Sequence, residues 1–212
     1  MTQATEINET IKRTRRYWFV DGLAEMSVGL TFSLLILYYR AAEGFKPEWL
    51  RLPAFVIGAP ALILGSTWLL GKAVNALKER ITYPRTGYVS YPRRQGSERW
   101  KRVILSATIG MAVGAATSFI SSSLPPIYQQ LFFTALVACV YVYIAYSMGL
   151  KRFYLLALGA LVLQVLIQLS SLEPDMQYFL FLIGQGALWF LSGIGALIAY
   201  LRQNRVSGIE EA

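Results

Sequence analysis

Residues 178–201 read YFLFLIGQGALWFLSGIGALIAYL, a stretch of 24 residues without a charged side chain. An α-helix rises 1.5 Å per residue, so a helix of this length exceeds the roughly 30 Å of hydrocarbon in a bilayer. A helix also satisfies its own backbone hydrogen bonds where water is absent. The stretch therefore predicts a membrane-spanning helix.

Five other apolar runs precede this one. With it they predict six spans, at about 17–39, 52–70, 103–124, 127–148, 153–172 and 178–201. Proline, glycine and charged residues separate the later runs and are typical of tight turns. We therefore expect one all-α domain over residues 1–212, a polytopic transmembrane helix bundle of three antiparallel hairpins.

The composition supports this class. Hydrophobic residues make up 55% of the chain, charged residues only 15%, and the mean hydropathy is +0.45. Soluble domains carry about 25% charged residues. Six spans of about 20 residues would use most of the 212 residues and leave no room for a second, soluble domain.

Lysines and arginines are distributed unevenly between the two sets of loops. Of the 20 in the chain, all but Arg40, Lys46 and Arg51 precede the first predicted span, follow the last, or lie between spans two and three or four and five. Short loops rich in these residues stay in the cytoplasm. We therefore expect both termini in the cytoplasm.

Residues 1–42 can also be interpreted as a signal peptide, with residues 12–16 as its basic region. The apolar stretch is longer than such a peptide needs, however, and it contains Asp21 and Glu25. A retained first span fits better.

The longest polar stretch, residues 72–102, is expected to form a basic cytoplasmic loop. Its first ten residues are good helix formers and predict that span two continues past the membrane. Tyr-Pro-Arg then occurs at 83–85 and 91–93, and each proline ends a helix. The loop is either a solvated connector or a binding surface for anionic lipid or a partner protein. The residues that would bind are Arg80, Tyr83, Arg85, Tyr88, Tyr91, Arg93 and Arg94.

Asp21 and Glu25 stand four residues apart in the first predicted span, which places both carboxylates on one helix face. Carboxylates there are costly unless they face protein or water. We expect structural pairing with arginines such as Arg80 or Arg85, or stabilisation by the helix N-terminus. An ion- or proton-binding role is the alternative, and the absence of any special role also stays open.

Small and helix-bending residues lie inside several spans. Residues 110–114 form a Gly-x-x-x-Gly motif. Span six also contains small residues that predict close helix packing, at Gly184, Gly186, Ser192, Gly193, Gly195 and Ala199. Pro60 in span two predicts a helix kink. The glutamines of spans five and six predict interhelical hydrogen bonds, or less often a polar cavity: Gln164, Gln168 and Gln185.

The sequence lacks the residues that several kinds of active site and metal site require. The chain has no histidine, so the base of a rhomboid-type serine protease and the commonest haem and zinc ligand are missing. Cys139 lies in an apolar run and is expected to be a small buried packing residue. Asp21-Gly22 matches the start of the metal motif of CDP-alcohol phosphotransferases, but the later paired aspartates have no counterpart. We expect no cofactor, no metal and no catalytic residue. Nucleic acid is not an expected partner, since no basic soluble module is present.

Residues 16–25, RYWFVDGLAE, and residues 77–88, LKERITYPRTGY, resemble a family of uncharacterised bacterial multi-pass membrane proteins. The resemblance implies a bacterial source, and hence the cytoplasmic (inner) membrane. It implies no activity.

Three functions remain. The first, which we favour, is an accessory or scaffold membrane protein whose basic loop binds a partner or anionic lipid. The second is a small transporter or channel subunit that uses Asp21, Glu25 and the kinked second span. The third is a lipid-modifying membrane enzyme. Transport usually needs more intramembrane charge than one pair of carboxylates at a helix end.

Overall fold

The computed structural model describes residues 19–44, 46, 48–86 and 124–204, together with positions 108 and 119. All regular secondary structure in these residues is helical, which confirms the all-α class for this part of the chain. The helices are α2 (Leu23–Glu43), η1 (Glu48–Leu50), α3 (Arg51–Pro53), the π-helical turn η2 (Ala54–Gly58), α4 (Ala59–Ile81), α5 (Tyr83–Thr86), α7 (Pro126–Met148), α8 (Arg152–Gln168) and α9 (Pro174–Gln203).

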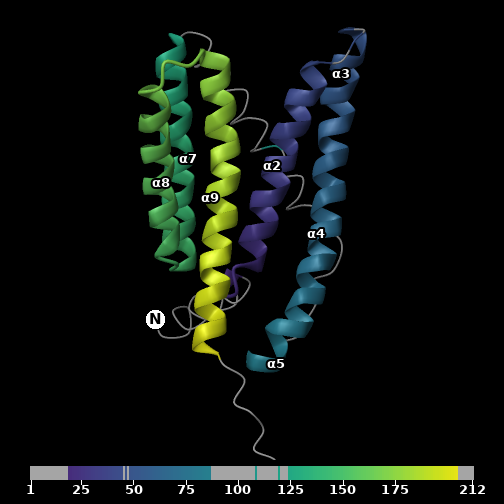
Figure 1. Ribbon diagram of the computed structural model, residues 1–212, viewed down its shortest axis with the longest axis vertical. Helices are drawn as coiled ribbons and strands as arrows, with labels where there is room; N and C mark the ends of the chain where they lie inside the picture. The colour runs from purple at the N-terminus through teal and green to yellow at the C-terminus, as the bar shows by residue number, and fades with distance from the viewer. Residues whose placement is uncertain are drawn as a thin grey trace, which may run out of the picture.

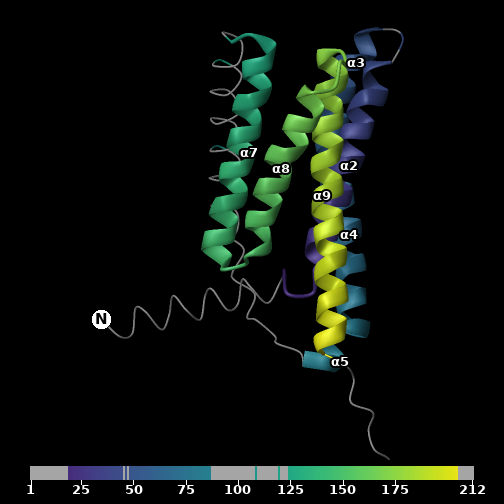
Figure 2. The same cartoon turned by 60° about the vertical axis from the view of Figure 1, so that its left-hand side comes forward.

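The long helices run side by side along one axis, and α9 lies between two groups of them. Figure 1 shows α2 and α4 on one side of α9 and α7 and α8 on the other. The turned view in Figure 2 shows α8 between α7 and α9. Packing follows this order, since α4 contacts α2, α2 contacts α9, α9 contacts α8 and α8 contacts α7.

Three described helices are long and apolar enough to cross a membrane: Arg51–Ile81, Ile127–Met148 and Pro174–Gln203. They cover the second, fourth and sixth predicted spans. The α8 helix is apolar but has only 17 residues, and α2 is not one of the three. The expectation of apolar, membrane-crossing helices is thus confirmed in its coarse form, while the number of spans and their orientation stay predictions. The third predicted span, with residues 110–114, lies outside the described residues apart from isolated positions.

Within the described residues, the predicted first span is interrupted at residues 20–22, between a helical position at 19 and the start of α2 at Leu23. The reason is Gly22, whose φ of +71° is a left-handed conformation that glycine adopts at little cost. The chain turns there, so Asp21 lies just outside α2 and Glu25 lies in its first turn.

Glycines bring α2 and α9 into close contact. Gly22 and Gly29 are seven residues apart, as are Gly186 and Gly193, and in the antiparallel pair Gly22 faces Gly193 while Gly29 faces Gly186. A Cβ atom added to Gly29 would lie 2.7 Å from the Gly186 carbonyl oxygen, and one added to Gly193 would lie 2.7 Å from the Gly22 carbonyl oxygen. The close packing predicted for span six is confirmed at Gly186 and Gly193 but not at Gly195, where a Cβ atom would have nothing within 4 Å.

The kink predicted at Pro60 stays a prediction, and what the structure has beside this proline is the π-helical turn η2. Proline has no N–H to offer the carbonyl four residues earlier, so the helix must accommodate a missing bond. The Tyr38 hydroxyl donates a hydrogen bond of 2.9 Å to the Ala54 carbonyl oxygen inside this turn. Gly58 leaves the space for that ring, because a Cβ atom there would collide with the Tyr38 hydroxyl.

The expected burial of Cys139 is wrong, because its side chain is exposed on α7. The face of α7 that packs against α8 carries Ala138, Tyr141 and Ala145 instead. The α7 helix carries apolar side chains on all of its faces, so the sequence pattern did not reveal which face packs against another helix.

Replacing Gly29 with alanine should lower the free energy of unfolding by about 1–3 kcal/mol, because the added methyl group forces two helix backbones apart. Gly195→Ala on α9 is the matched control, since nothing lies within 4 Å of a Cβ atom there. Reversible denaturation in detergent micelles would measure both. Equal stability of the two variants would contradict the close α2–α9 contact.

Candidate functional site

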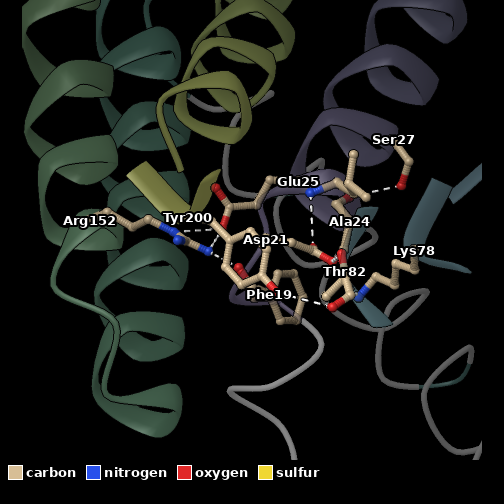
Figure 3. Close-up of polar contacts among 10 residues, drawn as sticks. Phe19, Asp21, Ala24, Glu25, Ser27, Lys78, Thr82, Arg152 and Tyr200 are labelled. Carbon is tan, nitrogen blue, oxygen red and sulfur yellow. Dashed lines mark hydrogen bonds and ion pairs between the residues drawn. The ribbon is translucent and has the colours of Figure 1, made fainter. Parts of the chain in front are cut away.

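Asp21 and Glu25 are completely buried and meet side chains from three other helices (Figure 3). We call the residues of this cluster the ionic network. Its members are Asp21, Glu25, Lys78, Thr82, Arg152, Ser192 and Tyr200.

Asp21 joins the start of α2 to the end of α4. Its Oδ2 lies 3.3 Å from Lys78 Nζ and accepts a hydrogen bond of 3.0 Å from the Thr82 hydroxyl. Its Oδ1 accepts a hydrogen bond of 3.2 Å from the backbone N–H of Leu23 and so satisfies one of the free donors at the start of α2. Both charged side chains are almost fully buried, at 0% and 1% exposure.

Glu25 joins α2 to α8 and α9. Its Oε1 accepts a hydrogen bond of 2.8 Å from Arg152 Nε and also pairs with Nη2 of the same guanidinium group. Its Oε2 accepts a hydrogen bond of 3.0 Å from the Ser192 hydroxyl. Arg152 Nη2 also donates to the carbonyl oxygen of Phe19, which ties down the chain entering α2.

Tyr200 connects α9 to the other half of the network. Its hydroxyl donates to the backbone carbonyl oxygen of Thr82 over 3.3 Å. The ionic network therefore fastens four helices, α2, α4, α8 and α9, at one end of the bundle. Such pairs are weak evidence for net stability, but losing one partner leaves a buried charge uncompensated and costs about 3–5 kcal/mol.

These contacts favour the structural role foreseen for Asp21 and Glu25 over ion handling, because each carboxylate already faces a cation and a hydroxyl group. The partners differ from those expected. Arg80 is exposed on α4, and the side chain of Arg85 lies outside the described residues. Within the described part of the chain, no three His, Cys, Asp or Glu side chains gather as metal ligands would.

Sequence reasoning missed Lys78 and Arg152 as partners. A signal existed for Arg152, because it opens α8 directly after Lys151, and two cations at a helix N-terminus oppose the helix dipole. Such a cation needs a nearby anion. The signal for Lys78 was weaker. It lies on one helix face with Val74 and Thr82, and all three are buried, but from the sequence a lysine and a threonine there would be expected to face solvent.

The candidate residues of the basic loop are described only in part. Arg80 is exposed near the end of α4, and Tyr83 is half-buried at the start of α5. Arg85 lies in α5 without a described side chain. The remaining candidates lie outside the described residues: Tyr88, Tyr91, Arg93 and Arg94.

The interhelical hydrogen bonds predicted for Gln164 and Gln168 are confirmed. Both side chains donate to Gln130 Oε1 on α7, over 3.3 Å and 2.7 Å. Thr134 adds a hydrogen bond of 3.2 Å to Gln164 Oε1. Gln185 bonds separately, accepting a hydrogen bond of 2.9 Å from the Tyr141 hydroxyl.

Comparison with protein-family models, curated proteins and solved structures found no match to this chain. The resemblance of residues 16–25 and 77–88 to bacterial membrane proteins stays a prediction.

Replacing Lys78 with methionine should destabilise the protein by about 3–5 kcal/mol, because the Asp21 carboxylate would stay buried without its cation. The double variant Asp21→Asn/Lys78→Met should recover much of this loss. Lys72→Met is the matched control, because Lys72 is exposed on the same helix. Denaturation in detergent would measure these variants and Asp21→Asn alone, and a double variant whose loss equals the sum of the two single losses would show that the two residues are not coupled.

Proposed function

We propose that this chain is a multi-pass protein of a bacterial cytoplasmic membrane that works without catalysis, as a scaffold whose basic cytoplasmic end binds anionic lipid headgroups. It would cross the membrane about six times, in three antiparallel hairpins with both termini in the cytoplasm. The three long apolar helices support the membrane setting.

One observation carries the lipid-binding proposal. Exposed cations gather toward the end of the bundle that holds the ionic network: Arg80 on α4, Lys151 before α8 and Arg202 on α9. Of the described acidic residues at this end, Asp21 and Glu25 are buried and paired, which leaves Glu79 exposed. Because each buried carboxylate is paired with its own cation, the exposed charges decide the balance, and Arg80, Lys151 and Arg202 outnumber Glu79.

Among the described residues, the opposite end of the bundle has no such excess. Its described exposed residues include the cations Arg40 and Lys46 and the anions Glu43, Glu173 and Asp175, with Arg40 and Glu43 paired at 2.7 Å. Positive charge near an anionic leaflet contributes about 1 kcal/mol per Lys or Arg. The difference between the two ends supports an orientation with the network end in the cytoplasm.

Transport is the second candidate, and one cavity favours it. A cavity of about 900 Å³ lies between α2, α3, α4 and α9 at the end away from the ionic network, and Arg40, Arg51 and Asp175 line part of it. Asp21 and Glu25 lie at the other end of α2 and are engaged with Lys78 and Arg152. The transport path first expected, through these two carboxylates, therefore has less support than the scaffold role.

Lipid binding can be tested on the detergent-solubilised protein with phosphatidylglycerol and phosphatidylcholine. We expect phosphatidylglycerol to bind more tightly, and Lys151→Gln/Arg202→Gln to weaken it by about 30-fold, since two charges contribute about 2 kcal/mol. Arg40→Gln/Lys46→Gln at the opposite end is the matched control and should bind normally. Equal binding of both lipids, or equal loss in both variants, would refute the proposal.

A further inference from the structure

Exposed tyrosines and tryptophans of the described residues lie at two levels along the bundle. We call those at the end away from the ionic network the far belt: Tyr39, Trp49, Tyr128 and Tyr178. We call those nearer the ionic network the near belt: Trp68, Tyr143, Tyr146 and Tyr154. Each belt draws on three or more helical elements, so neither follows from the residue pattern of a single helix.

Aromatic contacts show that the far belt forms one level. The ring centroids of Tyr39 and Phe55 are 4.4 Å apart, and those of Tyr178 and Phe133 are 5.9 Å apart. Tyr39, Phe55 and Tyr178 also line the same cavity. Tyr128 precedes Phe133 by five residues, or about 8 Å of helix.

The near belt surrounds the turn between α7 and α8. Tyr146 is two residues from the end of α7, and Tyr154 is two residues from the start of α8. Tyr143 lies one helical turn before Tyr146.

Trp68 of α4 belongs to the same level. Arg152, at the start of α8, donates a hydrogen bond to Glu25, and the neighbouring Ala24 lines a cavity together with Val74 of α4. The α7–α8 turn is therefore level with about Val74. Trp68 precedes Val74 by six residues, or about 9 Å of helix, which is close to the depth of Tyr143.

The two belts are about one hydrocarbon thickness apart. Trp49 and Trp68 are separated by about 28 Å of helix, and Tyr128 and Tyr146 by about 27 Å, at 1.5 Å per residue. The hydrocarbon core of a bilayer is about 30 Å thick, and Trp and Tyr are enriched at its two interfaces. The large exposed side chains between the belts on α3, η2, α4 and α7 are aliphatic: Leu52, Val56, Ile57, Ile63, Leu64, Leu131, Val140 and Val142.

Two helices are too long for this thickness. The segment 51–81 has 31 residues and α9 has 30, so each is about 45 Å long. To fit within 30 Å they would have to tilt by about 48°, whereas membrane helices tilt by up to about 40°. Figure 1 shows that α4 and α9 both continue past the α7–α8 turn at the same end of the bundle.

A cation next to the near belt supports a membrane boundary there. Lys72 Nζ lies 3.7 Å from the centroid of the Trp68 ring. An ammonium group is costly inside hydrocarbon, and lysines near the ends of membrane helices extend their charge toward the interface. Trp68 thus combines an exposed aromatic ring with a charge that needs polar surroundings.

We propose that the two belts seat the protein in the bilayer, with the near belt at the cytoplasmic boundary of the hydrocarbon. The ionic network then lies at headgroup depth, and the last turns of α4 and α9 stand in the headgroup layer and the water beyond it. This inference rests on the membrane setting of the proposed function and adds the depth. It also accounts for the buried ion pairs, because charges at headgroup depth cost less than charges at the bilayer centre.

Cysteine labelling in phospholipid vesicles would test this depth. In a Cys139→Ala background, Leu64→Cys and Leu77→Cys each place one thiol at an exposed position of α4, on opposite sides of the near belt. Lys46→Cys places one beyond the far belt. A water-soluble maleimide, supplied on both sides of the membrane, reacts with the thiolate, which forms in water and not in hydrocarbon. Leu77→Cys and Lys46→Cys should react at least about tenfold faster than Leu64→Cys.

Two controls separate depth from burial within the protein. All three variants should react at equal rates after denaturation in sodium dodecyl sulfate. The unaltered protein offers a check that needs no substitution, because Cys139 is exposed on α7 between the belts. Cys139 should stay unlabelled in vesicles and become labelled in the denaturant.

Each other outcome overturns a different claim. Equal rates for all three variants in vesicles would show that hydrocarbon does not cover Leu64, which overturns both the depth and the membrane setting. Slow labelling of Leu77→Cys together with Leu64→Cys would extend the hydrocarbon past the near belt and overturn the depth alone. The expected labelling with equal binding of phosphatidylglycerol and phosphatidylcholine would support the depth and refute the lipid-binding scaffold.

Discussion

Two buried ion pairs, Asp21 with Lys78 and Glu25 with Arg152, constrain the arrangement of the described helices. A charge in an apolar interior needs an opposite charge and hydrogen bonds close by. The start of α2 must therefore lie against both the end of α4 and the start of α8. The glycine contacts between α2 and α9 make this geometry reachable, because they let the two backbones approach until Ser192 can bond Glu25. The ion pairs determine which helices lie next to α2, and the glycines determine how closely α2 and α9 approach each other.

The same constraint shapes the surface. The basic residues at the network end form two groups. Lys78 and Arg152 form ion pairs with buried carboxylates, while Arg80 and Lys151 are exposed. Each buried carboxylate is matched by its own cation, so the ionic network adds no net charge to this end of the bundle. The positive surface that the proposed attraction to an anionic leaflet needs comes from the exposed cations Arg80, Lys151 and Arg202.

The helices themselves could be predicted well from the sequence, since long apolar runs mark them directly. The bounds of the predicted spans 127–148 and 178–201 nearly match those of α7 and α9. The π-helical turn lies next to the proline that suggested a kink. The partners of Asp21 and Glu25 could not be predicted, because spacing along one helix says nothing about which residues of other helices face it. The exposure of Cys139 was missed for the same reason. An apolar residue on a uniformly apolar helix gives no sign of its neighbours.

Satisfied and unsatisfied polar groups distinguish the ionic network from a second set of hydrogen bonds. In the ionic network every carboxylate oxygen has a donor, so the cluster is closed and holds structure together. The Trp189–Tyr141–Gln185 chain has the opposite property, because it ends at Gln185 Nε2, which is buried without a hydrogen-bond partner. Burying a donor without a partner costs about 1–3 kcal/mol, so the middle of α9 gives up stability that the fully bonded carboxylates at the network end retain.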